Sequence, residues 1–236
     1  MNMDKVLLEV DKLSIWYETK KYIVKDSKLS ISENEIIALV GVNGAGKTTL
    51  INTLVGIHSK YSLGEFIFRN EKLEFDDESF KMNRIAVFSQ DESFRYWNFV
   101  EYMKFIFETY NIPLDSKYID YLIDGFSFRK YINYMKKDLS MGNKKKFSLI
   151  VAFGLRLPFL ILDEPVDGLD FESTAFLYKI IKEYKAYGSI LMSTHVTESI
   201  NESCDSVVIL NGGKIGPKNQ IQSKLSISDI LYITRE

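Results

Sequence analysis

Short runs of apolar residues, each closed by glycine or polar residues, predict where the strands and helices of this chain lie. Residues 36–40 read IIALV, an unbroken aliphatic run typical of a strand buried on both faces. Beyond the glycines that follow, Leu50, Ile51 and Leu54 recur at helical spacing, and Gly56 stands where a helix C-cap is expected. The pattern therefore predicts a strand, a glycine turn and a helix.

Further apolar runs repeat this alternation toward the C-terminus. A helix is predicted from about Glu172 to Tyr187, and the turn Asn211-Gly212-Gly213 predicts a hairpin into residues 214–216. Buried strands that alternate with helices indicate an α/β sheet. The predicted strands are residues 84–90, 159–163, 189–194 and 206–210.

Three segments depart from this alternation. Residues 1–35 hold two short β-like runs separated by charged turns, which favours an antiparallel edge region. Residues 94–134 are dense in aromatic residues with little strand character, and they predict a helical subdomain inserted between sheet strands, with most of the aromatics in its core. The tail from about residue 214 to residue 236 is too short for another domain.

Composition and charge narrow the class of protein. The 236 residues are 46% hydrophobic, enough for one large domain, and 30 basic against 32 acidic side chains give a net charge of −2. This balance does not steer the chain toward nucleic acid or anionic lipid, so no nucleic-acid partner is expected. Cys204 is the single cysteine, which excludes an internal disulfide. We expect a cytoplasmic compartment, because no signal segment precedes Asp4 and the most apolar stretch, 147–162, is shorter than the ~18 uncharged residues of a membrane span.

The motif GVNGAGKT, residues 41–48, matches the phosphate-binding loop pattern. Gly41, Gly44 and Gly46 let backbone N–H groups converge on phosphate oxygens, and the helix beginning near Lys47 adds its positive end. Lys47 would reach the β- and γ-phosphates, and Thr48 would bind Mg²⁺. The simpler interpretation is a glycine turn between a strand and a helix. The residues expected to bind the nucleotide here are Gly41, Val42, Asn43, Gly44, Ala45, Gly46, Lys47, Thr48 and Thr49.

The motif FLILDEP, residues 159–165, places two carboxylates at the end of a strand. Asp163 can hold the magnesium shell, and Glu164 can orient or accept a proton from an attacking water molecule. The alternative is a pair of acidic residues that only end a strand.

With these motifs in this order, the chain resembles the ATP-binding subunit of an ABC transporter over most of its length. The resemblance implies a P-loop NTPase (RecA-like) α/β core with an N-terminal antiparallel β subdomain and an inserted helical subdomain. It divides the chain into residues 1–92 and 150–215 for the core and β subdomain, 93–149 for the helical subdomain, and 216–236 for a C-terminal tail.

The resemblance also implies roles for residues outside the phosphate loop. Tyr17 would stack on adenine, although a core strand aromatic is the alternative and Trp16 is a rival. Gln90, ending its strand, would contact Mg²⁺ and sense the membrane partner. The segment DGLD, ending at Asp170, matches the family's loop that crosses to the second subunit. His195 stands where the family has a histidine that contacts the γ-phosphate.

The segment LSMGNKKK, residues 139–146, falls where the family has its signature motif. In the family this motif covers the ATP held by the other subunit's phosphate loop, so Ser140 would hydrogen-bond the γ-phosphate and Gly142 would let the backbone approach. Met141 and Asn143 depart from the common form LSGGQ. The three lysines, residues 144–146, are interpreted as helical residues with solvated side chains, and a nucleic-acid patch is the alternative.

The function implied is an Mg²⁺-dependent ATPase that works as a dimer of cassettes beside an integral membrane transporter subunit, at the cytoplasmic face of the cell membrane. A signature of the form LSxGxxKK favours export of a drug, lantibiotic or cytolytic peptide. The alternative is a soluble ABC ATPase that drives an assembly process such as iron–sulfur cluster biogenesis. Cell fractionation would separate the two hypotheses.

Overall fold

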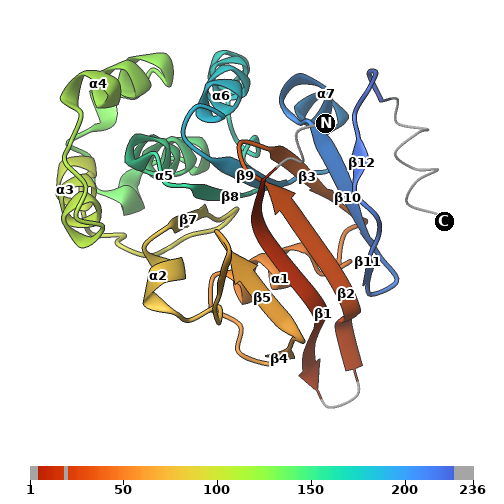
Figure 1. Ribbon diagram of the computed structural model, residues 1–236. Helices are drawn as coiled ribbons and strands as arrows, with labels where there is room; N and C mark the ends of the chain where they lie inside the picture. Colours follow the sequence, from red (N-terminus) through yellow and green to blue (C-terminus); the bar gives the residue numbers. More distant parts are fainter. Residues whose placement is uncertain (1–4, 19–20, 226–236) are drawn as a thin grey trace.

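The computed structural model describes residues 5–18 and 21–225. Two β-sheets pack against each other, and helices cover the outer face of the larger sheet (Figure 1). The part of the predicted tail beyond residue 225, and the segment before Lys5, lie outside the described residues.

The larger sheet is mainly parallel and forms the centre of the molecule. Its strands β10, β3, β9, β8 and β7 run parallel in that spatial order, while β11 and β12 pair antiparallel with β10. The predicted strands are confirmed, with shifts of one residue at the ends of β9 and β10 and of three residues at the end of β7. The bounds are β3 Ile36–Val40, β7 Arg84–Val87, β8 Phe159–Asp163, β9 Ser189–Ser193, β10 Ser206–Asn211, β11 Lys214–Ile215 and β12 Asn219–Gln220.

The carboxyl ends of the parallel strands meet at one edge of this sheet, as in other α/β sheets that bind ligands there. The phosphate loop leaves β3, Glu164 leaves β8, and His195 follows β9 at this edge. One prediction is wrong in detail, because β7 ends at Val87 and Gln90 lies in the loop beyond it rather than at the strand end.

The smaller sheet is antiparallel, with strand order β2-β1-β5-β6 and β4 paired with β1. The N-terminal antiparallel region is thus confirmed, but the two short runs separated by a turn are wrong. They form one continuous strand, because Lys12 adopts φ +51 and a register shift between Val10 and Leu13 absorbs the charged residues as a bulge. The bounds are β1 Val6–Glu18, β2 Lys21–Ser32, β4 Tyr61–Ser62, β5 Glu65–Phe68 and β6 Glu71–Lys72.

Helices occupy the space around the parallel sheet. The helix α1 contacts both β1 and β8 and so lies between the two sheets, whereas α3 and α4 contact α5 at the far end of the molecule (Figure 1). The helix predicted over 172–187 ends three residues early, at Tyr184, and residues 185–187 form a turn before Gly188. The bounds are α1 Lys47–Leu54, α2 Glu78–Lys81, α3 Phe99–Thr109, α4 Ser116–Gly125, α5 Met141–Leu155, α6 Phe171–Tyr184 and α7 Thr197–Ser203, with 3-10 turns at Arg129–Tyr131 and Lys136–Asp138.

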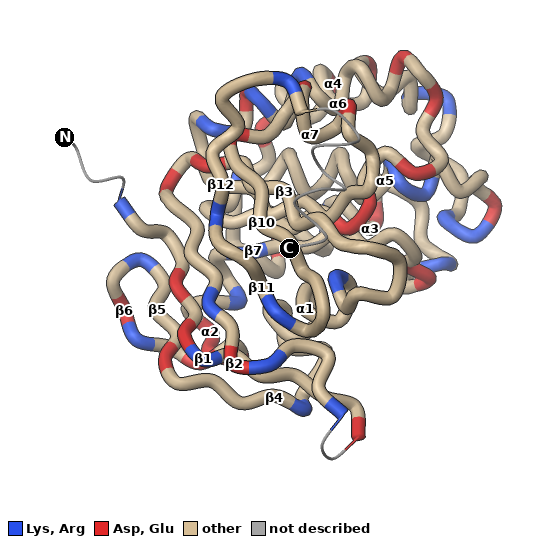
Figure 2. Tube along the Cα trace, turned by 90° about the vertical axis from the view of Figure 1, so that its right-hand side faces the viewer, with Lys and Arg blue, Asp and Glu red and all other residues tan. Residues whose placement is uncertain are grey.

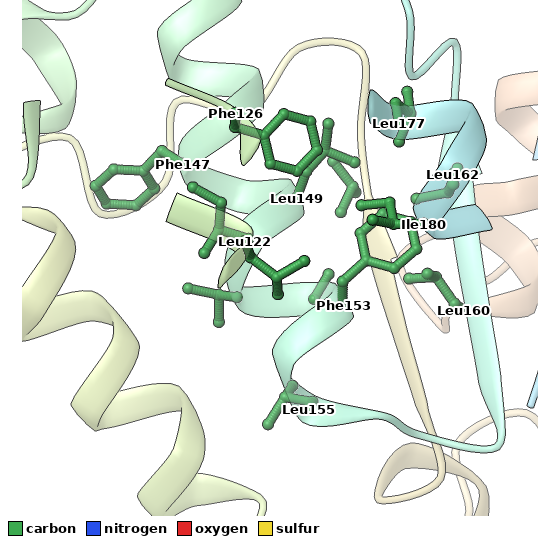
Figure 3. Close-up of a cluster of buried hydrophobic side chains, with 14 of the residues drawn as sticks. Leu122, Phe126, Phe147, Leu149, Phe153, Leu155, Leu160, Leu162, Leu177 and Ile180 are labelled. Atoms are coloured by element: carbon green, nitrogen blue, oxygen red, sulfur yellow. The ribbon is translucent and has the colours of Figure 1, made fainter. Parts of the chain in front are cut away.

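The core on the helical side is built around α5. Phe147 and Phe153 of this helix pack among side chains of α4, β8 and α6, such as Leu122, Leu160 and Ile180 (Figure 3). Most aromatic residues of the segment 94–134 lie in or against this cluster, as predicted. Truncating a buried phenylalanine here should cost about 3–5 kcal/mol, because the surrounding elements cannot close the cavity.

The interpretation of residues 144–146 as solvated lysines is wrong for two of the three. Successive residues of an α-helix point about 100° apart, so the three side chains leave α5 in different directions. Lys145 and Lys146 are only 4% and 5% exposed, whereas Lys144 remains partly exposed and pairs with Glu92 at 2.9 Å. Since α5 is covered on nearly every side, only one of these directions leads to solvent.

The surface carries charges of both signs in alternation, as the interspersed basic and acidic segments of Figure 2 show. In the described part of the chain, no helix combines the length and the apolar character that crossing a bilayer requires.

Candidate active site

The phosphate loop is held in its shape by its glycines and their neighbours. Gly44 and Gly46 adopt φ +81 and +105, a region that disfavours side chains, and Gly46 caps the N-terminus of α1. A Cβ at Gly41 would lie 2.5 Å from the carbonyl oxygen of Leu210. The loop can therefore present backbone N–H groups at the start of α1, as phosphate binding requires.

Lys47 lies folded over this loop. Its Nζ donates a hydrogen bond to the carbonyl oxygen of Gly41 at 2.8 Å and lies 3.9 Å from a carboxylate oxygen of Glu164. Residues 42–44 and Thr48 are exposed around it. A cation with few fixed partners, next to exposed loop backbone, is suited to bind the oxygens of a phosphate chain.

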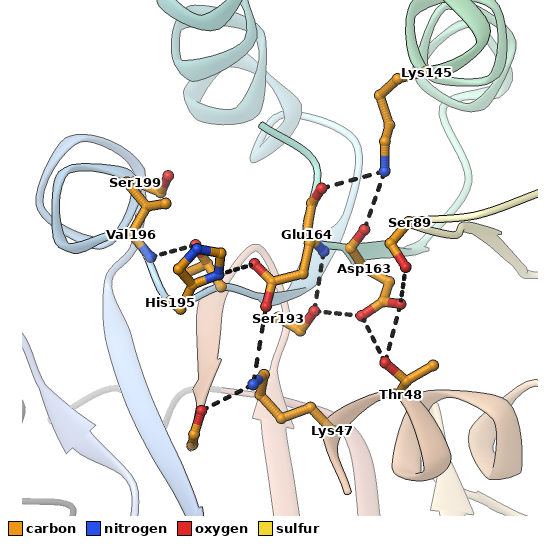
Figure 4. A network of polar contacts seen from close by, with 12 residues as sticks. Lys47, Thr48, Ser89, Lys145, Asp163, Glu164, Ser193, His195, Val196 and Ser199 are labelled. Atoms are coloured by element: carbon orange, nitrogen blue, oxygen red, sulfur yellow. Dashed lines mark hydrogen bonds and ion pairs between the residues drawn. The ribbon is translucent and has the colours of Figure 1, made fainter. Parts of the chain in front are cut away.

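Asp163 ends β8 and is almost completely buried. Its carboxylate accepts hydrogen bonds from three hydroxyl groups, Ser193 at 2.6 Å, Ser89 at 3.1 Å and Thr48 at 3.2 Å (Figure 4). A carboxylate beside a threonine hydroxyl, at the phosphate loop, offers the oxygen ligands that Mg²⁺ prefers. These residues fit the magnesium ion that the sequence predicts.

Glu164 follows with an unusual backbone conformation, φ +45. Its carboxylate lies between two cationic or polar groups, His195 Nδ1 at 2.9 Å and Lys47 Nζ at 3.9 Å. Asp167 completes a group of potential ligand atoms, within 4.8 Å of one another, with Glu164 and His195. Glu164 therefore stands where a water molecule that attacks a phosphate bound by Lys47 could give up its proton.

Tyr17 lies beside the phosphate loop, at the end of β1. It is 49% exposed, its hydroxyl group lies 3.1 Å from that of Thr49, and its ring contacts the ring of His58. Trp16, the rival, is less exposed and packs edge-on against Tyr22. The position and exposure of Tyr17 suit a ring that stacks on a base, and this role stays a prediction.

The signature segment begins α5, as its sequence suggests, and Ser140 caps the helix by accepting a hydrogen bond from the backbone N–H of Asn143. A Cβ at Gly142 would lie 2.1 Å from the carbonyl oxygen of Gly168, so this glycine is required by close packing within the chain. The methyl group of Met141 also lies against Gly168. The signature segment and the loop after Glu164 thus form one packed unit.

Asp170 joins this unit through two contacts. One carboxylate oxygen caps α6 at the backbone N–H of Ser173, and the other pairs with Lys146 Nζ at 2.7 Å. The hydrogen bond from Lys146 is the main reason that the pKa of Asp170 lies below its usual range. The role of Asp170 as a nucleotide contact stays a prediction.

The sequence-predicted residues fall into two groups. Lys47, Thr48, Asp163, Glu164 and His195 come together in one network (Figure 4). Within residues 5–18 and 21–225, no hydrogen bond or ion pair joins the side chains of Ser140 and Asp170 to the phosphate loop. Gln90 is exposed. Its neighbour Ser89 donates a hydrogen bond to the carboxylate of Asp163.

Three residues of the site were missed by reasoning from the sequence. Ser193 is the last residue of β9, two positions before His195, so its place at the carboxyl end of a parallel strand could have indicated that it reaches the site. Ser89 lies in a short loop with no such signal. Lys145 opens a long apolar run, and a cation on the buried side of that helix is the signal for it.

Comparisons with known proteins agree with this geometry. A family model described as ABC transporter matches residues 24–167, more than half of the chain. The putative ABC transporter ATP-binding protein AlbC of Bacillus subtilis is 33% identical over 236 residues, 98% of this chain and 96% of AlbC. The energy-coupling factor transporter ATP-binding protein EcfA2 of Clostridium perfringens is 28% identical over 221 residues, 90% of this chain and 77% of EcfA2.

A solved structure described as the ATP binding subunit of an ABC transporter superposes with a TM-score of 0.86 at 26% identity. The match covers 98% of this chain and 100% of that one. The predicted fold class, an α/β P-loop NTPase core with an antiparallel β region, is confirmed.

Proposed function

The chain belongs to the ABC transporter family, as an ATP-binding subunit that hydrolyses ATP, and from this premise we propose how its residues perform the reaction and which transporter it serves. The observation that carries the mechanism is the position of Glu164 between Lys47 and His195, next to Asp163. The phosphate loop binds the phosphates of ATP, with Tyr17 against the adenine.

Hydrolysis needs a water molecule in line with the γ-phosphate and a group that accepts its proton. In this proposal Glu164 accepts that proton, and His195 contacts the γ-phosphate from the end of β9. Lys47 holds the β- and γ-phosphates. When Mg²⁺ is bound by Thr48 and Asp163, it neutralises charge that develops on the phosphate oxygens. The products are ADP and inorganic phosphate.

Substituting Glu164 by glutamine tests this assignment. Glu164→Gln should lower turnover by about 10²–10⁴-fold, because the amide accepts no proton, and should leave ATP binding intact. Turnover and nucleotide binding are measured on the same preparation. The control is Glu172→Gln, an exposed acid in the first turn of α6 that touches none of these residues and should leave turnover unchanged. Turnover close to wild type in Glu164→Gln would remove Glu164 from its role.

We propose further that the working unit contains two cassettes. Ser140 and Gly142 lie at the N-terminus of the 15-residue helix α5, whose positive end favours an anion, yet neither has an anionic partner among residues 5–18 and 21–225. A second cassette that presents its phosphate loop to this helix would supply the phosphate. This supports the pairing of cassettes that the sequence predicts.

The membrane subunit has a candidate docking site in a groove of about 290 Å³ between the core and α3. Ile57, Ile85, Phe88 and Ile106 supply apolar lining, and Lys81 adds a positive charge. Ile57 is 64% exposed beside these apolar neighbours, so an occupant of the groove would remove its side chain from water. Since Phe88 lies in the loop that carries Gln90, an occupant of this groove would touch the segment that joins it to the active site.

Docking is tested by co-purification from detergent extracts of the native host. Ile57→Glu should abolish capture of a multi-spanning membrane protein, because a charge would be buried against apolar surface, and should retain ATP binding. The control is Leu114→Glu, which adds the same charge at an exposed leucine outside the groove. Capture that survives Ile57→Glu would exclude this groove as the docking site. A wild-type chain that fractionates without any membrane protein would favour the soluble assembly ATPase.

We propose export of a peptide, antibiotic or other amphipathic compound, at the cytoplasmic face of the membrane. The signature segment, with Met141, Asn143 and three lysines, supports this choice over import. The complex captured through the groove, reconstituted in vesicles with ATP outside, should move its substrate into the lumen. Movement in the opposite direction would overturn export and leave the ATPase assignment intact.

A further inference from the structure

Lys145 occupies a position behind the active site that none of the assigned roles explains. It is 4% exposed, and its ammonium group donates hydrogen bonds to three backbone carbonyl groups, of which Figure 4 shows those of Asp163 and Glu164. The acceptors are the oxygens of Phe88 at 3.1 Å, Asp163 at 3.3 Å and Glu164 at 3.2 Å. An ammonium group has three donors, and here each donor has one carbonyl group.

Burying this cation is costly in free energy. Burial is the main cause that lowers the pKa of Lys145, and the negative charges of Asp163, Asp167, Glu164 and Asp91 oppose this effect. An apolar residue would fill the same space in an otherwise apolar helix at a smaller desolvation cost. The energetic gain of Lys145 therefore lies in the backbone that it holds.

That backbone includes the strained residue of the site. Glu164 adopts φ +45, a conformation that costs a non-glycine residue roughly 1–3 kcal/mol unless its surroundings hold it. Its N–H group donates to the carbonyl and hydroxyl oxygens of Ser193, and its carbonyl group accepts from Lys145. Ser193 and Lys145 thus fix the two peptide groups that flank the Glu164 side chain.

We infer that Lys145 is a positioning residue for ATP hydrolysis: its ammonium group holds the backbone of Glu164 in the conformation that places the carboxylate between Lys47 and His195. The inference rests on the proposed function, in which Glu164 accepts the proton of the attacking water.

The third carbonyl group extends this role to a second loop. Phe88 lies between β7 and Gln90, and it also lines the groove proposed for the membrane subunit. Lys145 therefore joins three segments at one nitrogen atom: the helix that carries the signature motif, the end of β8 and the loop of Gln90. A displacement of Phe88 in the groove can therefore reach the backbone of Glu164 through Lys145.

The test compares Lys145→Met with Lys145→Gln in the full chain. Methionine keeps the length and removes all three donors, so kcat should fall by roughly 100-fold, the effect of an error of about 1 Å in the position of a catalytic group. Glutamine keeps two N–H donors, so its loss should be roughly 10-fold. KM for ATP should change less than about threefold in both, because the phosphate loop is untouched.

The matched control is Lys182→Met, an exposed lysine of α6 that pairs with Glu202 at 3.6 Å. It should keep kcat within about twofold of wild type, as expected for a surface ion pair. A folded Lys145→Met variant with the kcat of the control would overturn the inference, and so would a rise in KM with kcat unchanged. If the methionine variant does not fold, the kcat and KM of Lys145→Gln decide between the same outcomes.

A double-mutant cycle separates positioning from a general effect on folding. In a Glu164→Gln background, Lys145→Met should lower the residual rate by less than about twofold, because the group it positions no longer acts. A full additional loss would mean that Lys145 acts elsewhere and would overturn the inference. Loss of turnover in Glu164→Gln but not in Lys145→Met rejects only this inference, whereas turnover retained in Glu164→Gln rejects the proposed role of Glu164.

Discussion

Two buried lysines approach Glu164 from opposite sides, and they differ in how fully their ammonium groups are engaged (Figure 4). On the α1 side, Lys47 donates to one carbonyl oxygen and lies 3.9 Å from the Glu164 carboxylate, next to exposed loop residues. On the α5 side, Lys145 donates to three carbonyl oxygens and has no donor left.

The difference separates the side that binds a ligand from the side that supports the site. A phosphate can replace the few partners of the Lys47 ammonium group at a small cost in free energy. Lys145 can lose one of its hydrogen bonds only if the backbone that carries the acceptor moves. The residues next to each lysine differ in the same way, exposed on the α1 side and packed or paired on the α5 side. Thr48 is exposed beside Lys47, while Gly142 and Lys146 are packed or paired beside Lys145.

The sharpest way to break this comparison is Lys47→Gln. We expect turnover and ATP affinity to fall by at least about 100-fold, since one charged donor to the phosphates is lost, while the unfolding midpoint in urea stays close to wild type. Nucleotide titration and chemical unfolding measure the two quantities. ATP affinity within threefold of wild type would mean that the α1 side is not the ligand side.

Gly142→Ala tests the support side with an expected intermediate effect. The new Cβ would meet the carbonyl oxygen of Gly168, so the two segments must separate, at a cost of about 1–3 kcal/mol in the free energy of unfolding. Binding of ATP to the phosphate loop should be unchanged. Gly216→Ala is the control, because its Cβ would lie at an ordinary 3.5 Å from Ile209, and it should stay within about 0.5 kcal/mol. Equal stability of both variants would contradict the close packing described.

The smallest expected effect is that of Asp170→Asn, which keeps the helix cap and removes the charge that pairs with Lys146. Because the Asp170 carboxylate is half exposed, we expect a loss of about 1 kcal/mol or less at neutral pH. The pKa of Asp170 is depressed in the folded state, so the pair stabilises the fold above the unfolded pKa of about 3.9. This stabilisation is lost progressively as pH falls from there through the lower pKa of the folded state. Unfolding experiments from pH 7 to pH 2 should therefore show the difference in stability between the two proteins shrinking in acid. A difference independent of pH would contradict the ion pair.

The strands and the phosphate loop could be predicted because their signals are local. An aliphatic run such as residues 36–40 fits a strand that is buried on both faces of an α/β sheet, and the glycines after it fix the turn. Asp163 and Glu164 followed from the same argument, since the end of a parallel strand leads to the sheet edge where ligands bind.

The side that supports the site could not be predicted, because residues of the same type in the same local sequence make different tertiary contacts. Lys144, Lys145 and Lys146 have the same local sequence, and only the position of Glu92, the carbonyl groups of three distant residues and Asp170 distinguishes them. The same limit applies to Gly142, whose close neighbour Gly168 lies 26 positions away in a loop whose path depends on the whole fold. Tertiary packing, rather than propensity, decides these positions.

The left-handed backbone of Glu164 has a consequence for how this position can vary. Glycine would adopt φ +45 without strain, so the chain would gain folding stability by about 1 kcal/mol or more if no side chain were needed here. Selection for stability alone would therefore favour glycine at position 164. The presence of a glutamate marks a trade-off between stability and activity. An inactive Glu164→Gly variant should unfold at a higher temperature than Glu164→Gln.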